Sequence, residues 1–187
     1  NFLAQKGISI DHLPPSFFIG GNTKQVWENI LRDDYDNWDV PTLQEEYNAY
    51  KQDNPLPYKE LIFPDVLKVL NEVKSRGLKI GLASSSVKAD ILRALEENHL
   101  DGFFDVVLSG EEFKESKPNP EIYLTALKHL NVEANQALII EDSEKGIAAG
   151  VAAGVEVWAI KDNRFGMDQG AAKGLLDNLV DVLDLLK

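Results

Sequence analysis

One pattern constrains the fold more than any other: from about residue 63 onward, short apolar runs alternate with longer segments whose apolar residues recur at helical spacing. The runs at 78–83 and 137–140 have the length and composition of buried strands. The segment 120–130 begins with a proline, which is favoured in the first turn of a helix. Because strands that alternate with helices pair in parallel and are covered on both sides, the sequence predicts an α/β fold with a doubly wound parallel sheet.

The expected elements follow directly from this pattern. Gly77 ends the first helix of the series, and glycines at positions 146, 150 and 154 favour close packing of a later helix on the sheet. We expect strands over residues 78–83, 106–108, 137–140 and 155–160, and helices over residues 64–77, 87–98, 120–130, 143–153 and 175–186.

The first part of the chain, residues 1 to about 60, differs in residue composition and pattern. It holds many charges, most of the aromatic Trp and Tyr residues and no convincing buried strand. Segments 24–31 and 43–53 have helical patterns and are separated by a polar stretch. We therefore predict a small helical domain over residues 1–58 and an α/β domain over residues 59–187.

Composition excludes several classes of function. Asp and Glu total 31 against 19 Lys and Arg, a net charge of -12, which opposes binding to nucleic acids and to anionic membranes. The chain has no cysteine, so disulfides, Cys-ligated zinc and thiol catalysis are excluded. No apolar run reaches the length of a membrane span, and the first residues lack the pattern of a signal peptide. We expect a soluble, cytoplasmic, monomeric protein.

Polar residues follow three of the predicted strands, at the edge where a parallel sheet presents its carboxyl ends to ligands. Ser84, Ser85 and Ser86 follow the first strand, and their hydroxyl and N–H groups could hold a phosphate at the start of the next helix. The alternative is a simple serine cap of that helix. Lys117 precedes Pro118 and offers a compact positive charge to phosphoryl oxygens, although a lone lysine of this kind is commonly a solvated loop residue.

An acidic pair, Glu141 and Asp142, ends the apolar run ALII. Carboxylates at this position could hold a divalent cation together with phosphate oxygens. The alternative is that Asp142 or Ser143 caps the following helix. Taken together, the serines, the lysine and the acidic pair indicate a site for phosphate and a metal ion.

The order of these motifs resembles the haloacid dehalogenase superfamily, in which a serine forms the second motif, Lys-Pro the third and an acidic pair the fourth. The segments LASSS, SKPNPEIY and IIEDSEKGIAAG match them at Ser84, Lys117, Glu141 and Asp142. The likeness is greatest to the branch of β-phosphoglucomutase and sugar-phosphate phosphatases, whose helical cap corresponds to residues 1–58. It implies that Ser84, Ser85 and Lys117 bind the transferring phosphoryl group and that Glu141 and Asp142 bind Mg²⁺.

The first motif of that family, Asp-x-Asp-Gly-Thr, has no match in this chain. The nearest acidic cluster, Asp33, Asp34 and Asp36, has no apolar strand before it. The resemblance implies that the absent strand, which carries the aspartate nucleophile, lies in the centre of the sheet, where its absence leaves neighbouring backbone groups unpaired. We therefore expect a segment before Asn1.

The resemblance implies phosphoryl transfer through an aspartyl phosphate on a small phosphorylated metabolite. The segment 17–31 is similar to the specificity loop of the cap, so Gly20, Gly21, Thr23 and Lys24, together with Ser86, are the expected substrate contacts. An arginine of the mutase is replaced by Thr23, which favours a phosphatase at least as much as a mutase. Two alternatives stay open: an inactive relative that binds a phosphorylated ligand or a protein, and a receiver-type phosphoacceptor domain.

Overall fold

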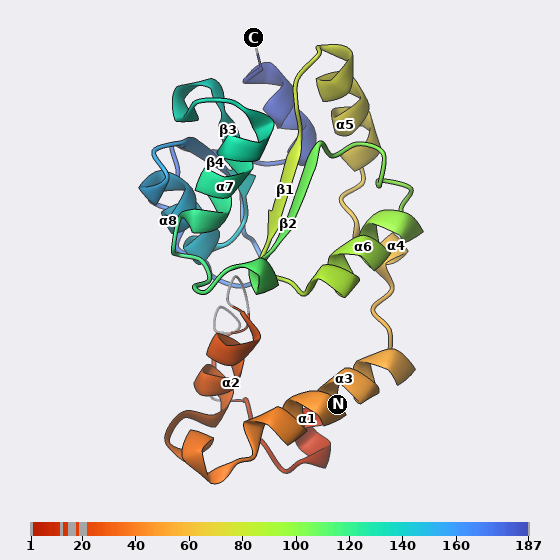
Figure 1. Cartoon of the computed structure of the whole chain (residues 1–187), viewed down its shortest axis with the longest axis vertical. Coiled ribbons are helices and arrows are strands. Elements are labelled where there is room, and N and C mark those ends of the chain that lie inside the picture. The colour runs from red at the N-terminus through yellow and green to blue at the C-terminus, as the bar shows by residue number, and fades with distance from the viewer. Residues whose placement is uncertain (1, 12, 15–17, 19–21, 187) are drawn as a thin grey trace.

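The computed structural model describes residues 2–11, 13–14, 18 and 22–186 (Figure 1). Its five described strands form two separate parallel sheets. In the first sheet β1 pairs with β2, and Ala83 lies opposite Leu108. In the second sheet β4 lies between β3 and β5. The strands are β1 (Gly81–Ser84), β2 (Val106–Ser109), β3 (Leu138–Glu141), β4 (Glu156–Ile160) and β5 (Gly174–Leu176).

Helices connect these strands and also form the first part of the chain. The α-helices are α1 (Phe2–Gln5), α2 (Thr23–Leu31), α3 (Val40–Asp53), α4 (Tyr58–Leu61), α5 (Val66–Ser75), α6 (Lys88–Glu97), α7 (Glu121–Leu130) and α8 (Glu144–Ala152). The described 3-10 helices are η2 (Arg32–Asn37), η3 (Gly110–Glu112), η4 (Ala134–Gln136) and η5 (Leu179–Asp184).

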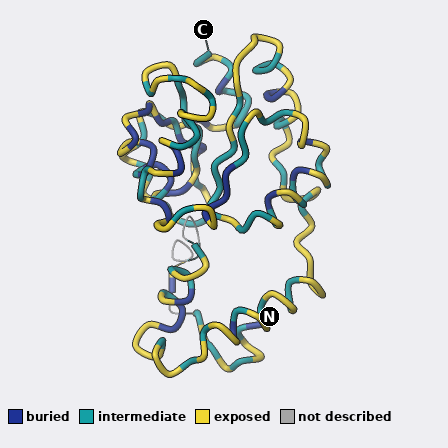
Figure 2. Tube along the Cα trace, viewed as in Figure 1, coloured by how far each residue is buried: buried dark blue, intermediate teal, exposed yellow. Residues whose placement is uncertain are grey.

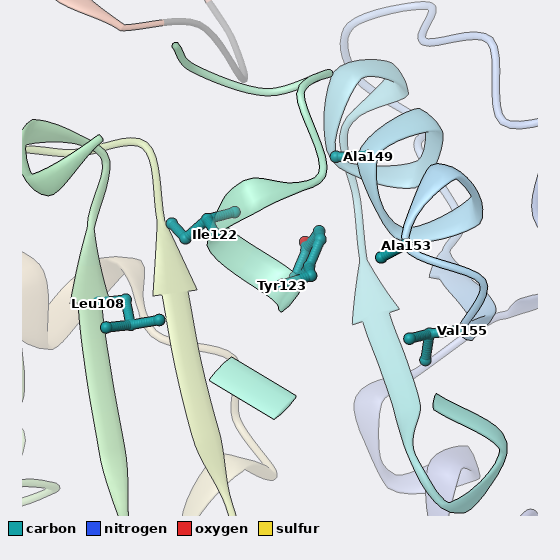
Figure 3. Packing of buried hydrophobic residues seen from close by; sticks show 6 residues of the cluster. All are labelled: Leu108, Ile122, Tyr123, Ala149, Ala153 and Val155. Atoms are coloured by element: carbon teal, nitrogen blue, oxygen red, sulfur yellow. The ribbon is translucent and has the colours of Figure 1, made fainter. Parts of the chain in front are cut away.

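Both faces of the strands are covered by helices. On one face, α7 and α8 form a single apolar cluster that includes Ala83 of the first sheet and Ile139 of the second. Figure 3 shows Ile122 and Tyr123 of α7 lying between Leu108 of β2 and the two labelled alanines, Ala149 of α8 and Ala153 just after it. On the other face, α5 packs against both sheets through Val69 and Leu70. The prediction of an α/β fold with parallel strands and helices on both faces is therefore confirmed.

The first helices gather around their own apolar cluster, which contains only residues from the first 50 positions, including Trp27 and Leu43. The indole of Trp27 donates a hydrogen bond of 2.5 Å to Gln44 Oε1, and Asn22 caps α2. Trp27, Trp38 and Tyr47 thus belong to the core of this region. Figure 2 shows an exposed trace between α3 and α4, where residues 52–57 are all exposed.

The last predicted element is wrong. A helix over residues 175–186 was expected, but Gly174–Leu176 forms β5, which pairs with β4 and extends the second sheet. Gly174 allows this approach because an added Cβ would lie 2.4 Å from Trp158 Cζ3. Asn178 and Asp181 then form a capping box at the start of the short η5. The apolar residues of this segment, although at helical spacing, therefore lie in a strand followed by a 3-10 helix.

Close packing of α8 agrees with the spacing of its glycines. A Cβ added to Gly150 would lie 2.6 Å from Val157 Cγ2 and 3.0 Å from Ile139 Cδ1. The helix can approach β3 and β4 only because this position has no side chain. None of the helices in the described part of the chain has both the length and the apolar character needed to cross a membrane.

Candidate active site

Lys117 lies at the carboxyl ends of β1 and β3 and is buried, with 6% of its side chain exposed. Its Nζ donates hydrogen bonds to the backbone O of Ala83 at 3.0 Å, to the Tyr123 hydroxyl at 2.9 Å and to Glu141 Oε1 at 2.6 Å. An ammonium has three N–H donors, so all of them are used. Lys117 is therefore a fixed charge that joins the two sheets, and the solvated loop lysine of the alternative interpretation is not what the structure shows.

Glu141, the last residue of β3, is surrounded by donors. Its Oε1 accepts from Lys117 and from the Tyr123 hydroxyl, the latter at 2.6 Å. Its Oε2 accepts from the backbone N of Asp142 at 3.1 Å and from the N and Oγ of Ser143 at 3.2 and 3.0 Å. These bonds occupy the lone pairs of both oxygens, so a metal ion could bind Glu141 only by replacing one of them.

Burial and charge act on these groups in different directions. Burial by itself raises the pKa of Glu141, but the positive charge and hydrogen bond of Lys117, with the hydrogen bonds of Tyr123 and Ser143, hold that pKa below its ordinary value. Burial, followed by the negative charge of Glu141, raises the pKa of the Tyr123 hydroxyl far above its ordinary range. At neutral pH the Tyr123 phenol is therefore neutral and Glu141 is a carboxylate.

Asp142 follows Glu141 and is exposed at the edge of a cavity of about 150 Å³. The cavity is also lined by Asp162, Arg164 and Phe165 from the loop after β4. Burial of the carboxyl, and then the charge of Glu141, raise the pKa of Asp142. Asp142 lines this cavity whereas Glu141 does not, so Asp142 is the carboxylate of the pair that could hold a metal ion there.

The loop after β4 is built around one carboxylate. Asp162 accepts from the backbone N of Arg164, Phe165 and Met167 at distances between 2.8 and 3.1 Å. Gln169 Nε2 donates to the backbone O of Asp142 at 2.9 Å and of Ile160 at 2.8 Å. Gln169 thus ties the end of β3 to the end of β4.

The serine segment after β1 lies at the same end of the first sheet. Ser84 ends β1, and its Oγ accepts from the backbone N of Ser86 at 3.1 Å. The backbone of Ser85 lies so close to Gly110 that a Cβ there would be 3.1 Å from Ser85 Cα. At the start of α6, the backbone N of Lys88 already donates to Glu111 Oε2 at 2.6 Å. The N–H group of the first residue of α6 is thus used by a carboxylate of the protein.

The other predicted residues lie away from this cluster or outside the described residues. Thr23 and Lys24 are exposed on α2, and Lys24 pairs with Glu28 at 3.7 Å. No hydrogen bond or ion pair within the described ranges joins either side chain to Lys117. Gly20 and Gly21 lie outside the described residues. Asp33, Asp34 and Asp36 are exposed on η2 and end no strand.

Sequence reasoning missed Tyr123, Ser143 and Gln169 as parts of the site. Ser143 was considered only as a helix cap; it does cap α8, where its Oγ accepts from the backbone N of Gly146 at 3.1 Å, but it also donates to Glu141. Tyr123 lies six residues after Lys117, and this short separation was the available signal. Gln169 gave none, because its side chain bonds to backbone atoms: the oxygens of Asp142 and Ile160 and the N–H of Asp162.

Comparisons with known proteins find related sequences. The sequence profile of haloacid dehalogenase-like hydrolases matches residues 5–160. The chain is 35% identical over 129 residues to a phosphorylated carbohydrates phosphatase of Thermotoga maritima, covering 66% of this chain and 59% of that protein. It is 30% identical over 139 residues to a phosphoglycolate phosphatase of Aquifex aeolicus, covering 74% of this chain and 63% of that protein.

Solved structures of other proteins have a similar fold. The crystal structure of β-phosphoglucomutase from Clostridium difficile matches with a TM-score of 0.79 and 25% identity, over 100% of this chain and 82% of that one. CbbY from Rhodobacter sphaeroides matches with a TM-score of 0.74 and 21% identity, over 95% of this chain and 83% of that one, which shows the fold alone. The chain thus spans less than two thirds of the two curated relatives described above.

Proposed function

Because the chain belongs to the haloacid dehalogenase-like hydrolases, we propose that the full-length protein is an enzyme that transfers the phosphoryl group of a small phosphorylated metabolite, a sugar phosphate being the preferred class. The observation that carries this proposal is the buried Lys117 ammonium at the carboxyl ends of β1 and β3, where it donates to the backbone O of Ala83, the residue before Ser84. A fixed positive charge at this edge can stabilise the negative charge that develops on phosphoryl oxygens in the transition state. The named activities of the relatives, on phosphorylated carbohydrates and phosphoglycolate, support the substrate class.

We assign different roles to the two adjacent carboxylates. Asp142 would hold Mg²⁺, because it lines the cavity and Glu141 does not. Glu141 would hold Lys117, because its oxygens are already hydrogen-bonded within the protein. When bound, Mg²⁺ supplies positive charge that offsets the charge of phosphoryl oxygens. Lys117 would act on the same group through its charge, because its three N–H groups are used within the protein, and Ser84 would contact that group at the end of β1.

The aspartate nucleophile belongs, in this proposal, to a strand between β1 and β3. Within the described residues β1 pairs only with β2, and β3 only with β4. Lys117 contacts Ala83 near the end of β1 and Glu141 at the end of β3. Helices α5 and α7 pack against both sheets. Unpaired edges of two parallel sheets under common helices suit one further parallel strand, whose carboxyl end would lie beside Lys117.

We also propose that residues 1–58 are a cap that selects the substrate and residues 59–187 the catalytic domain. The separate apolar cluster of the first 50 residues and the exposed stretch 52–57 support this division. Thr23 and Lys24, exposed on α2, remain the candidate substrate contacts of the cap. Thr23 in place of an arginine favours a phosphatase at least as much as a mutase, although Lys24 could replace the arginine in part. The monomeric state and the cytoplasmic location stay predictions from the sequence.

The test is release of inorganic phosphate from a panel of sugar phosphates by the full-length protein, with Mg²⁺ and with excess chelator. We expect turnover that needs the metal and that falls at least about 100-fold in Lys117→Met. Because this variant leaves Glu141 buried and unpaired, the double variant with Glu141→Gln is measured as well, and circular dichroism checks the fold of both.

Lys68→Met, at an exposed position of α5, is the matched control and should keep full activity. Near-normal turnover in a folded Lys117 variant would contradict the assigned role. No release from any substrate by the wild-type protein, with phosphorylated ligands still bound, would favour the inactive relative instead.

A further inference from the structure

The hydroxyl of Tyr123 occupies a central place in the Lys117 cluster. Tyr123 lies in the first turn of α7 and is 7% exposed. Its oxygen accepts a hydrogen bond of 2.9 Å from Lys117 Nζ and donates one of 2.6 Å to Glu141 Oε1. The lysine and the carboxylate are thus joined twice, once directly and once through the phenol.

The phenol also limits where the ammonium can lie. Lys117 Nζ is 4.7 Å from the centre of the Tyr123 ring, within the range of a cation–π contact. The ring itself is held by the apolar cluster of α7, α8 and the strands, next to Ile122 and Ala149 (Figure 3). Because the Tyr123 ring is fixed by packing on α7, it also fixes the position of the flexible Lys117 side chain.

The directions of its two hydrogen bonds explain why a hydroxyl is needed at this position. A group at this point must accept from an ammonium and donate to a carboxylate, and a phenol does both. A phenylalanine would leave one N–H of Lys117 and one lone pair of Glu141 without a partner in a buried place, which is costly for both groups. The lysine would then gain freedom to move on the side where the phenol had held it.

We propose that Tyr123 is a positioning residue for phosphoryl transfer, which holds the Lys117 ammonium at the carboxyl end of β1 for the transition state. This inference rests on the proposed function. It assigns to Tyr123 a task that acts through Lys117, and it predicts that loss of the hydroxyl oxygen lowers turnover more than it weakens substrate binding.

The test compares Tyr123→Phe with Tyr50→Phe in the full-length protein. Tyr50 is a matched control because it is a half-buried tyrosine of the first apolar cluster, where its ring packs against Phe2. For the sugar phosphate hydrolysed fastest by the wild type, Tyr123→Phe should lower kcat about 10- to 100-fold and change KM less than about threefold. Tyr50→Phe should change neither.

A second measurement does not depend on activity. A buried ammonium with three acceptors exchanges its protons slowly, so the side-chain ¹H–¹⁵N signal of Lys117 should be visible in the wild type and absent from Lys117→Met. We expect the signal to broaden or vanish in Tyr123→Phe and to persist in Tyr50→Phe. An unchanged kcat with an unchanged lysine signal in Tyr123→Phe would overturn the proposal.

The two proposals fail in different ways. If the wild-type protein releases no phosphate, the proposed function fails, and a persistent lysine signal in Tyr123→Phe would then also reject the positioning role. If the wild type is active and Tyr123→Phe loses only thermal stability while kcat is retained, Tyr123 is merely structural and only this inference is wrong.

Discussion

Two neighbouring carboxylates, Glu141 and Asp142, follow the same strand and have opposite electrostatic surroundings. Glu141 faces Lys117 and several donors, and its pKa is lowered. Burial of the Asp142 carboxyl and the negative charge of Glu141 both disfavour the ionised form of Asp142, so its pKa is raised. Groups whose pKa values are moved apart in this way commonly have different tasks in a site. Here the first is bound within the protein, whereas the second remains open to a ligand.

These shifts predict opposite effects on stability. Glu141 stabilises the folded state above its ordinary pKa of 4.5, and this contribution is lost as pH falls through its lowered folded value. Asp142 acts in reverse: its contribution is present below its ordinary pKa of 3.8 and is lost as pH rises through its raised folded value.

Glu141→Gln should therefore lower the free energy of unfolding at pH 7 by about 3 to 5 kcal/mol, because it leaves Lys117 unpaired, and should flatten the loss of stability in acid. Asp142→Asn should raise the free energy of unfolding at pH 7. Urea titrations in metal-free buffer at several pH values measure both effects. Changes of equal sign in the two variants at pH 7 would show that the contrast between the carboxylates is wrong.

For single residues, the sequence indicated which side chains lie at the same sheet edge but not which hydrogen bonds they form with one another. Lys117 and Glu141 were expected at one sheet edge because each follows a strand or precedes a proline-led helix, and the structure joins them at 2.6 Å. Their direct ion pair was not foreseen, since a motif names residues without their contacts. Tyr123 was taken only as part of a helix, because its task depends on how α7 sits between two sheets.

At the scale of elements, α8 depends on a glycine that leaves room for the site. A Cβ added to Gly146 would lie 2.0 Å from the Cδ and Oε1 of Glu141, too close for either group to remain in place. Replacing glycine by alanine inside a helix normally adds up to about 1 kcal/mol of stability. Gly146→Ala should instead destabilise the protein and displace Glu141 from Lys117.

Thermal unfolding and the side-chain signal of Lys117 measure these two effects. Gly102→Ala is the control, because no atom lies within 4 Å of the added Cβ, and it should leave both unchanged. A Gly146→Ala protein as stable as the wild type, with the lysine signal intact, would mean that the carboxylate has room that the structure does not show.

The link between β3 and β4 gives a second prediction at this scale. Gln169→Leu removes the bonds from Nε2 to Asp142 and Ile160. If Asp142 holds the metal ion as proposed, Gln169 orients a metal ligand, and such groups commonly contribute 10- to 100-fold to metal affinity. We then expect the affinity for Mn²⁺, used as a paramagnetic substitute for Mg²⁺, to fall about 10-fold. Gln136→Leu, at the last residue of η4 before β3, is the matched control and should retain the wild-type affinity. Equal affinities in both variants would contradict the role of Gln169.

Element types were predictable where a local pattern agrees with the tertiary structure. The apolar runs before Ser84 and Asp142 became strands, and the proline-led segment became α7. The final segment was misread because its leucines have helical spacing, whereas pairing with β4 decides the conformation of Gly174–Leu176. A short strand at a sheet edge depends on its neighbour more than on its own residues.

At the scale of the whole molecule, the described residues form two sheets that share helices on both faces. The edges of β1 and β3 that face away from β2 and β4 have no strand partner in this part of the chain. The side chains of β3 are only half-buried although Leu138, Ile139 and Ile140 are apolar. Such edges exchange amide protons readily and invite pairing with another strand.

The proposed central strand is tested by hydrogen exchange on two proteins, the chain of residues 1–187 and the full-length protein. If a strand lies between β1 and β3 in the full-length protein, their amides should exchange much more slowly there than in the shorter chain. Amides of β4 serve as an internal control, because β4 is paired on both sides by β3 and β5 and should exchange similarly in both proteins. Equal exchange of β1 and β3 amides in the two proteins would contradict a central strand, and with it the place proposed for the nucleophile beside Lys117.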